Sequence, residues 1–142
     1  MMFVLDTNVV SELRKIRLGR VDENVAQWAD SVDAADLYLS AITVQELEIG
    51  VLLAERRDPS QGAIFRTWFE GHVLPAFAGR ILSVDTAVAQ RSAAFHVPDP
   101  RPFRDSLIAA TALVHGMTIV TRNVADFQSA GVSILNPWEA QR

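Results

Sequence analysis

The sequence predicts an α/β fold in which a mainly parallel, five-stranded sheet is covered by helices on both faces. Two observations predict it. Five short apolar runs, each about as long as a buried parallel strand, are spread along the 142 residues. Segments with apolar residues at helical spacing separate these runs. Strands that alternate with helices are typical of a parallel sheet packed between two helical layers.

The expected strands consist mostly of apolar and β-favouring residues, as strands buried on both faces do. They cover residues 3–5, 37–42, 81–84, 118–121 and 132–135. The first run ends at Asp6, and a helix is expected to begin near Val9. The order of the runs therefore places a polar residue directly after the first strand.

Five further helices are expected between the strands. Apolar residues recur at i, i+3, i+4 and i+7 within residues 25–32, 44–52, 64–73, 88–95 and 107–114. Asp85 is the expected N-cap of the fourth of these helices, and Gly116 the expected stop of the last. Two turn-rich stretches interrupt the pattern, residues 56–62 and 98–102. The second holds three prolines and predicts a stiff, extended entry into a helix near Phe103.

Length and composition indicate a single globular domain over residues 1–142. Apolar residues make up 49% and charged residues 21% of the chain, which argues against disorder. No apolar run is long enough for a membrane span, and the first residues lack the features of a signal peptide. The chain has no cysteine, so disulfides and thiolate metal sites are excluded. These features favour a cytoplasmic protein without membrane contact.

The net charge of −4 does not suggest a nucleic-acid binder at first sight, because 17 acidic residues face 13 basic ones. Four acidic residues, however, follow the ends of different predicted elements. Without those four, acidic and basic residues would balance at 13 each. The excess negative charge of the chain can therefore reside in one site that a divalent cation would neutralise.

The four carboxylates are expected at one edge of the sheet, because ligands of open parallel sheets bind at the carboxyl ends of the strands. Asp6 follows the first strand and Asp126 follows the fourth. Glu46 lies in the first turns of the helix after the second strand, and Asp105 in the first turn of the helix before the fourth. Taken one at a time, each has a structural alternative: an N-cap, a solvated helix residue, a helix-dipole partner or a turn residue.

Taken together, the four carboxylates indicate a metal site. Two carboxylates about 4 to 5 Å apart repel by roughly 3 to 4 kcal/mol at an effective dielectric near 20. A divalent cation removes this repulsion, and ligands that are all oxygen select Mg²⁺ or Mn²⁺. Such a site suits phosphoryl chemistry, in which a metal activates an attacking water. No Walker A motif, dinucleotide fingerprint or nucleophile elbow offers another reaction.

Four ordered segments resemble the motifs of PIN-domain proteins, and most closely those of the VapC/FitB branch of bacterial toxins. They are residues 3–13, 43–51, 104–112 and 121–127. The resemblance runs from Phe3 to about Trp138. It implies a three-layer α/β/α fold and a Mg²⁺- or Mn²⁺-dependent ribonuclease that forms a homodimer or higher assembly and is inhibited by a cognate antitoxin.

The resemblance also implies roles for individual residues. Asp6 and Asp105 would be the core metal ligands, while Glu46 and Asp126 would complete the site, if necessary through water. The supporting hydrogen-bonding residues would be Thr7, Asn8, Thr121 and Asn123. Apart from the resemblance, basic residues next to the motifs predict a rim that could hold an RNA backbone, formed by Arg14, Lys15, Arg104 and Arg122. The alternative for the first two is a solvated turn.

Three further questions stay open at the level of sequence. The aromatic residues Phe65, Trp68 and Phe69 serve either the core or an interface. The chain could also be a catalytically silent PIN-like module that binds a partner or nucleic acid. An aspartate-nucleophile phosphatase, with Asp6 as the nucleophile, would want a second carboxylate two positions on, where this chain has Asn8.

Overall fold

A parallel sheet forms the middle of the molecule. The structure, a computed structural model, describes residues 1–141. Five strands pair in the order β3-β2-β1-β4-β5, and every pairing is parallel. The strands are β1 (Phe3–Leu5), β2 (Leu37–Ser40), β3 (Ile81–Leu82), β4 (Thr118–Val120) and β5 (Ile134–Leu135). The predicted fold class, a three-layer α/β/α domain with a five-stranded sheet, is confirmed.

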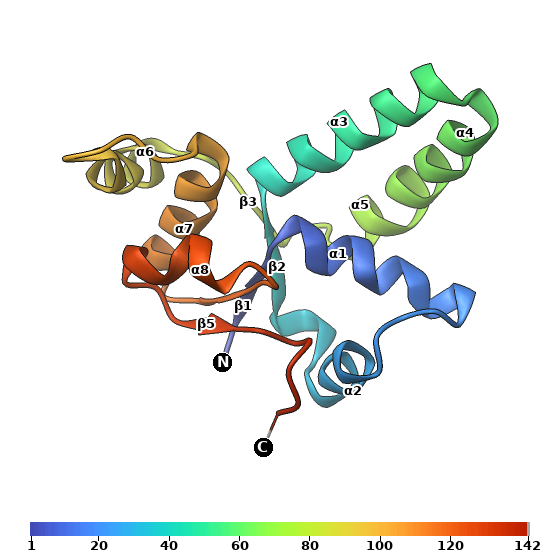
Figure 1. The fold of residues 1–142 in the computed structure, drawn as a ribbon, viewed down its shortest axis with the longest axis horizontal. Helices are drawn as coiled ribbons and strands as arrows, with labels where there is room; N and C mark the ends of the chain where they lie inside the picture. The colour runs from blue at the N-terminus through green and yellow to red at the C-terminus, as the bar shows by residue number, and fades with distance from the viewer. Residues whose placement is uncertain (142) are drawn as a thin grey trace.

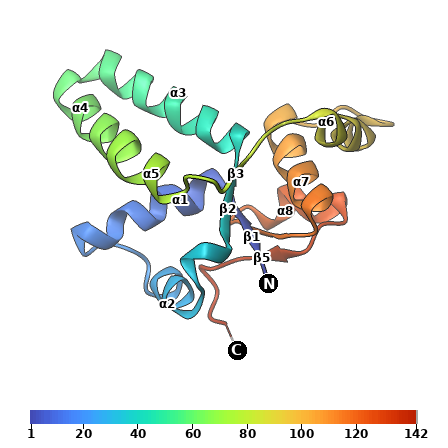
Figure 2. The same ribbon diagram turned by 180° about the vertical axis from the view of Figure 1, so that it is seen from behind.

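Helices cover both faces of this sheet (Figure 1; Figure 2). On one side lie α1 (Thr7–Leu13), α2 (Glu23–Ser31), α3 (Ala41–Arg57), α4 (Pro59–Trp68) and α5 (Leu74–Ala76). On the other side lie α6 (Thr86–Ala93), α7 (Phe103–His115) and α8 (Val124–Phe127). Short 3₁₀ or π segments join them: Arg14–Leu18, Ala34–Asp36, Phe69–Val73, Ala94–His96 and Gln128–Ala130. In residues 1–141, none of these helices has the length and apolar character that a membrane crossing requires.

Alternation along β1 divides the core into two clusters, because successive side chains of a strand point to opposite faces. Phe3 and Leu5 pack with Trp28 of α2 and with buried side chains of α1, α3 and the π segment. Val4, between them, packs instead with Ile108 of α7 and with α8. Both faces of the central strand are thus fully buried, which explains why it is apolar at every position.

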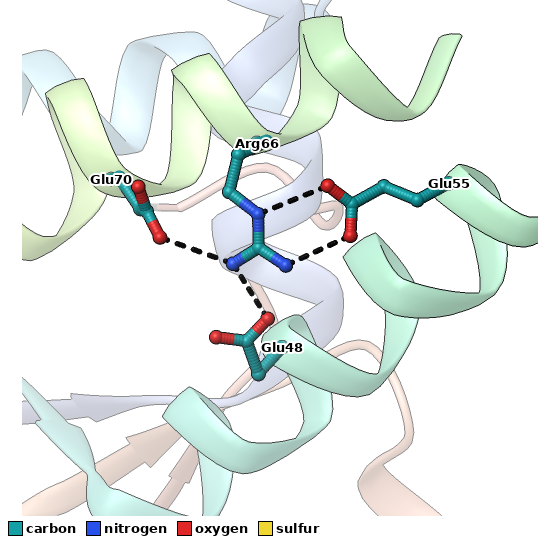
Figure 3. Close-up of polar contacts among 4 residues, drawn as sticks. All are labelled: Glu48, Glu55, Arg66 and Glu70. Carbon is teal, nitrogen blue, oxygen red and sulfur yellow. Dashed lines mark hydrogen bonds and ion pairs between the residues drawn. The ribbon is translucent and has the colours of Figure 1, made fainter. Parts of the chain in front are cut away.

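The helices α3 and α4 form a long hairpin that extends away from the sheet (Figure 1). Arg66 of α4 holds the two together. Its guanidinium lies 2.7 Å from a carboxylate oxygen of Glu48 and 3.0 Å from one of Glu55, both on α3, and 3.2 Å from Glu70 (Figure 3). Gly62 allows the close approach, since a Cβ there would lie 2.3 Å from the Cα of Glu55.

Several predicted boundaries are wrong by a few residues. The second strand ends at Ser40 rather than at residue 42, because the Ser40 hydroxyl accepts a hydrogen bond from the Ile42 backbone N–H and begins α3. The third, fourth and fifth strands are also shorter than expected. The first helix begins at Thr7, not near Val9. Side-chain caps account for two of these boundaries, Ser40 for α3 and Asp6 for α1, and hydrophobicity alone does not report them.

The turn-rich stretch at residues 56–62 is mostly helical, which corrects the prediction of a turn. Only Asp58 interrupts the helices. Its carboxylate accepts hydrogen bonds from the N–H groups of Ser60 and Gln61, and Pro59 occupies the first turn of α4. Proline at that position costs no helical hydrogen bond. The second stretch, residues 98–102, is not helical, and α7 begins at Phe103 as predicted.

Candidate active site

Asp6 lies at the carboxyl edge of the sheet, between the end of β1 and the start of α1. Its side chain is 5% exposed and caps α1 by accepting a hydrogen bond from the Thr7 N–H at 2.8 Å. Its other oxygen accepts hydrogen bonds from the Thr121 hydroxyl at 2.8 Å and from the Asn8 amide at 3.4 Å. Burial raises the pKa of Asp6 above its usual value, despite the hydrogen bonds from Thr121 and Thr7. Asp6 is therefore the N-cap of α1, as its structural alternative predicted, and its carboxylate is also held in place by Thr121 and Asn8.

Glu46 reaches the same edge from the second turn of α3. One of its carboxylate oxygens accepts a hydrogen bond from the Thr7 hydroxyl at 2.8 Å. The other lies 3.7 Å from the guanidinium of Arg104 on α7. Glu46 is half-buried, so it is not the fully solvated helix residue of the structural alternative. Thr7 thus links α1 to α3, with its N–H on Asp6 and its hydroxyl on Glu46.

Asp105 and Asp126 approach from the opposite side of the edge, on α7 and α8. Burial raises the pKa of Asp105 to about 6, and the negative charges of Asp6, Asp126 and Glu46 add to the rise. Asp126 is exposed, and its charge also contributes to the raised pKa of Asp6. Asp105 is therefore close enough to the other three predicted carboxylates to be affected by their charges, although the four come from separate segments.

The predicted supporting residues form a hydrogen-bonded chain around Asp6. Thr121 is buried directly after β4, and its hydroxyl donates to Asp6 while accepting from the Asn123 N–H at 3.0 Å. The side-chain Oδ1 of Asn8 accepts a hydrogen bond from the Arg122 backbone N–H at 3.4 Å. These hydrogen bonds join the loop after β4 to the start of α1 and hold the Asp6 carboxylate in place.

The predicted basic rim is spread over three places. Arg104 is exposed and lies next to Glu46. Arg14 lies in a groove that also contains Thr7 and Glu46, and its guanidinium stacks over the rings of Phe65 and Trp68, 4.4 Å and 5.8 Å from their centres. Lys15 lines the same groove as Arg14 and also pairs with Glu12 at 3.0 Å. Arg122 lies apart from them and stacks on Trp138.

The aromatic residues at the end of α4 and the start of the following π segment divide between the two expected roles. Phe69 is 1% exposed and belongs to the core. Phe65 and Trp68 are partly buried, pack against that core and also line the groove that contains Arg14. The core interpretation therefore accounts for Phe69 fully and for the other two in part.

The donor set decides which metal fits this edge. Within residues 1–141, no three His, Cys, Asp or Glu side chains are gathered closely enough to enclose an ion. The four carboxylates supply oxygen only, which suits a hard cation, and Mg²⁺ characteristically keeps several waters while binding to one or two carboxylates. The residues therefore fit a Mg²⁺- or Mn²⁺-type ion held by few protein ligands, not a closed cage such as structural zinc requires.

Fold and site together define a class: parallel α/β/α proteins with a carboxylate centre at the C-terminal edge of the central strands. The chain belongs to the PIN domain family, whose model matches residues 3–131. The predicted PIN resemblance is therefore confirmed.

Individual relatives cover nearly the whole chain. It is 44% identical to VapC ribonuclease Y4jK of Sinorhizobium fredii over 97% of this chain and 99% of the relative. It is 41% identical to toxin FitB of Neisseria gonorrhoeae over 96% of this chain and 99% of the relative. The crystal structure of FitAcB from Neisseria gonorrhoeae superposes with a TM-score of 0.85 at 39% identity, covering 97% of this chain and 99% of that one.

Two features of the site were not predicted from the sequence. One is the hydroxyl of Thr7 bridging to Glu46, which lies 39 positions further on. The other is a cavity bordered by Asp105, Asp126 and the proline-rich loop before α7. Residues 94–95, the loop before α7, α7 itself and α8 all contribute to the cavity wall, so no local pattern in the sequence marks it.

Proposed function

We propose that this protein is a Mg²⁺- or Mn²⁺-dependent ribonuclease and the toxin of a toxin–antitoxin pair. The observation that carries the proposal is the environment of Asp105 at this edge of the sheet, where burial, together with the charges of the other three carboxylates, raises its pKa to about 6. A fold that gathers uncompensated carboxylates is poised to bind a cation. The names of the ribonuclease and toxin relatives support the same reading.

In this proposal Asp6 and Asp105 hold the metal, and Glu46 and Asp126 complete the site through water. When bound, the ion supplies positive charge that stabilises phosphate oxygens and makes water a stronger nucleophile. Thr121, Asn8 and the Thr7 N–H orient Asp6.

Glu46 is the proposed acceptor of the proton from the attacking water. Its orientation depends on the Thr7 hydroxyl. The exposed guanidinium of Arg104, next to Glu46, is placed to contact the RNA phosphate, for which the planar Arg fork is well suited.

An inhibiting partner follows from the proposed activity. A ribonuclease that cuts RNA of its own cell has to be held inactive until it is needed. We therefore propose an antitoxin protein as the partner, in line with the toxin name of a relative. The homodimer or higher assembly expected from the sequence stays a prediction. The cytoplasmic location predicted from the sequence stays a prediction.

The test is cleavage of a structured RNA by the purified protein with Mg²⁺ or Mn²⁺, in parallel with an EDTA control. We expect cleavage to vanish with EDTA and in Asp6→Asn. Asp30→Asn, an exposed acid on α2, is the matched control and should cleave as the unmodified protein does. Metal-dependent cleavage by Asp6→Asn at the unmodified rate would contradict the assignment.

The toxin part of the proposal is tested in cells. Induced expression should arrest growth, and Asp6→Asn should abolish the arrest. Equal arrest by both proteins would show that RNA cleavage at this site is not the cause. Metal binding by calorimetry without cleavage of any RNA would instead favour the silent binding module.

A further inference from the structure

A cavity of about 240 Å³ opens directly beside the carboxylate centre. Asp105 and Asp126 form part of its wall, and Arg101 adds one cation. Much of the remaining wall consists of small or apolar side chains, among them Ala109 of α7 and Ala125 of α8. A ligand in this cavity would therefore touch apolar walls while another part of it lies at the carboxylates.

Two neighbouring rings, an exposed one on Phe103 and a half-buried one on His96, belong to the segments that line this cavity. Phe103, the first residue of α7, is 74% exposed, and its ring lies 4.8 Å from that of His96. His96 stands in the chain between two residues that line the cavity, and its Nδ1 accepts a hydrogen bond from the Arg101 N–H at 3.2 Å. The rings are thus fixed to the loop that forms one wall. Leaving a Phe ring in water costs hydrophobic free energy, which a stacking ligand would recover.

The volume of the cavity and the residues around it indicate which kind of ligand it can hold. The cavity is smaller than the roughly 300 to 1,000 Å³ of sites that take a drug-sized molecule. Its volume suits a small group better than a helix of a partner protein, which is about 10 Å across. A nucleobase is such a small group, and aromatic side chains and Arg are the groups that hold unstacked bases in single-stranded nucleic acid.

We propose that this cavity receives one nucleobase of the RNA next to the bond that is cut, and that the ring of Phe103 stacks on a neighbouring base. The proposal rests on the ribonuclease function proposed above. Arg101 contacts the phosphate or an acceptor atom of the base. The cavity then sets which nucleotide is accepted beside the scissile phosphate, while the carboxylates carry out the reaction.

The experiment compares two substrates in the presence of Mn²⁺. One is an RNA that the protein cuts, and the other is bis(4-nitrophenyl) phosphate, a small diester with no nucleobase. Two variants test the site: Phe103→Ala removes the exposed ring, and Ala125→Leu narrows the cavity from an exposed position on α8. Leu53→Ala is the matched control, because Leu53 is 57% exposed on α3, outside the site.

We expect the ratio of kcat/KM for RNA to kcat/KM for the diester to fall about fivefold or more in both variants, as loss of a stacked base does. The control should keep the ratio of the unmodified protein. An abasic ribose at the position beside the cut should lower cleavage by the unmodified protein, and should lower it less in Ala125→Leu, because both changes remove the same contact.

The outcomes separate the two proposals. If the unmodified protein cuts both substrates while Phe103→Ala and Ala125→Leu keep its ratio, the base site is overturned and the ribonuclease stands. If neither substrate is hydrolysed with any divalent metal, the proposed function fails and the base site with it. If Phe103→Ala changes only self-association, the ring is a protein contact and the stacking role is overturned.

Discussion

Replacing Asp105 by Asn should stabilise the metal-free protein at neutral pH, although Asp105 is a proposed metal ligand. Burial, and then the charges of Asp6, Asp126 and Glu46, raise the pKa of Asp105 to about 6 in the folded protein. The folded state therefore holds the proton more tightly than the unfolded chain. This group's contribution to stability is full below the unfolded pKa near 4 and is lost as the pH rises through about 6.

The magnitude follows from the shift. The pKa moves from 3.8 to about 6, and each unit corresponds to 1.36 kcal/mol, which gives an upper limit of about 3 kcal/mol. Asp105 is only half-buried, so water screens part of this repulsion. We expect Asp105→Asn to raise the free energy of unfolding by about 1 kcal/mol at pH 8.

The assay is urea unfolding in EDTA for the unmodified protein, Asp105→Asn and the control Asp30→Asn. At pH 4.5 the increase in the free energy of unfolding caused by Asp105→Asn should be less than half of the increase at pH 8. Adding Mg²⁺ should reverse the order, because a ligand at 100 times its Kd stabilises by about 2.7 kcal/mol and the variant binds it poorly. A variant that is less stable than the unmodified protein at pH 8 without metal would refute the clustering of charge.

Three further predictions concern single contacts. Thr7→Val should lower kcat for RNA about tenfold with little change in KM, because Glu46 loses a charged hydrogen bond, and an unchanged kcat would contradict its positioning role. Gly62→Ala should cost about 2 kcal/mol in urea unfolding, since its Cβ would lie 2.3 Å from the backbone of α3. Gly50→Ala is the matched control, because a Cβ at Gly50 would have no atom within 4 Å, and it should raise the free energy of unfolding by about 0.5 to 1 kcal/mol. Equal effects of the two substitutions on stability would refute the close approach at Gly62. Arg66→Gln should lower the urea midpoint, less so at high salt, and a salt-independent loss would argue against ion pairing.

The order of strands and helices is local information, and the sequence carries it well. Apolar runs such as residues 3–5 become strands, and Gly116 ends α7 in a left-handed conformation, as expected. The strand-end rule also brought Asp6 and Asp126 to the same edge. These features could be predicted because each depends on residues a few positions apart.

Segments whose ends depend on distant partners were harder to predict. Residues 56–62 contain Asp, Pro, Ser and Gly, all typical of turns, yet most of them are helical. The reason is that Gly62 packs closely against α3 and Arg66 pairs with two of its glutamates. Packing between α3 and α4 thus overrides the local preference for a turn.

The roles of the individual acids divide in the same way. Glu12 and Glu46 are both glutamates on helices, Glu12 on α1 and Glu46 on α3. In the structure Glu12 is 8% exposed and accepts hydrogen bonds from the Asp22 N–H and from Lys15, so it fastens the entry to α2. Glu46 instead accepts from Thr7 at the candidate site. The sequence by itself determined the layers, the parallel sheet and the edge where carboxylates gather, because periodicity and chain order suffice for them. Only the tertiary structure decided which hydroxyl meets which carboxylate and where a cavity remains, because those contacts depend on how helices far apart in the chain pack against each other.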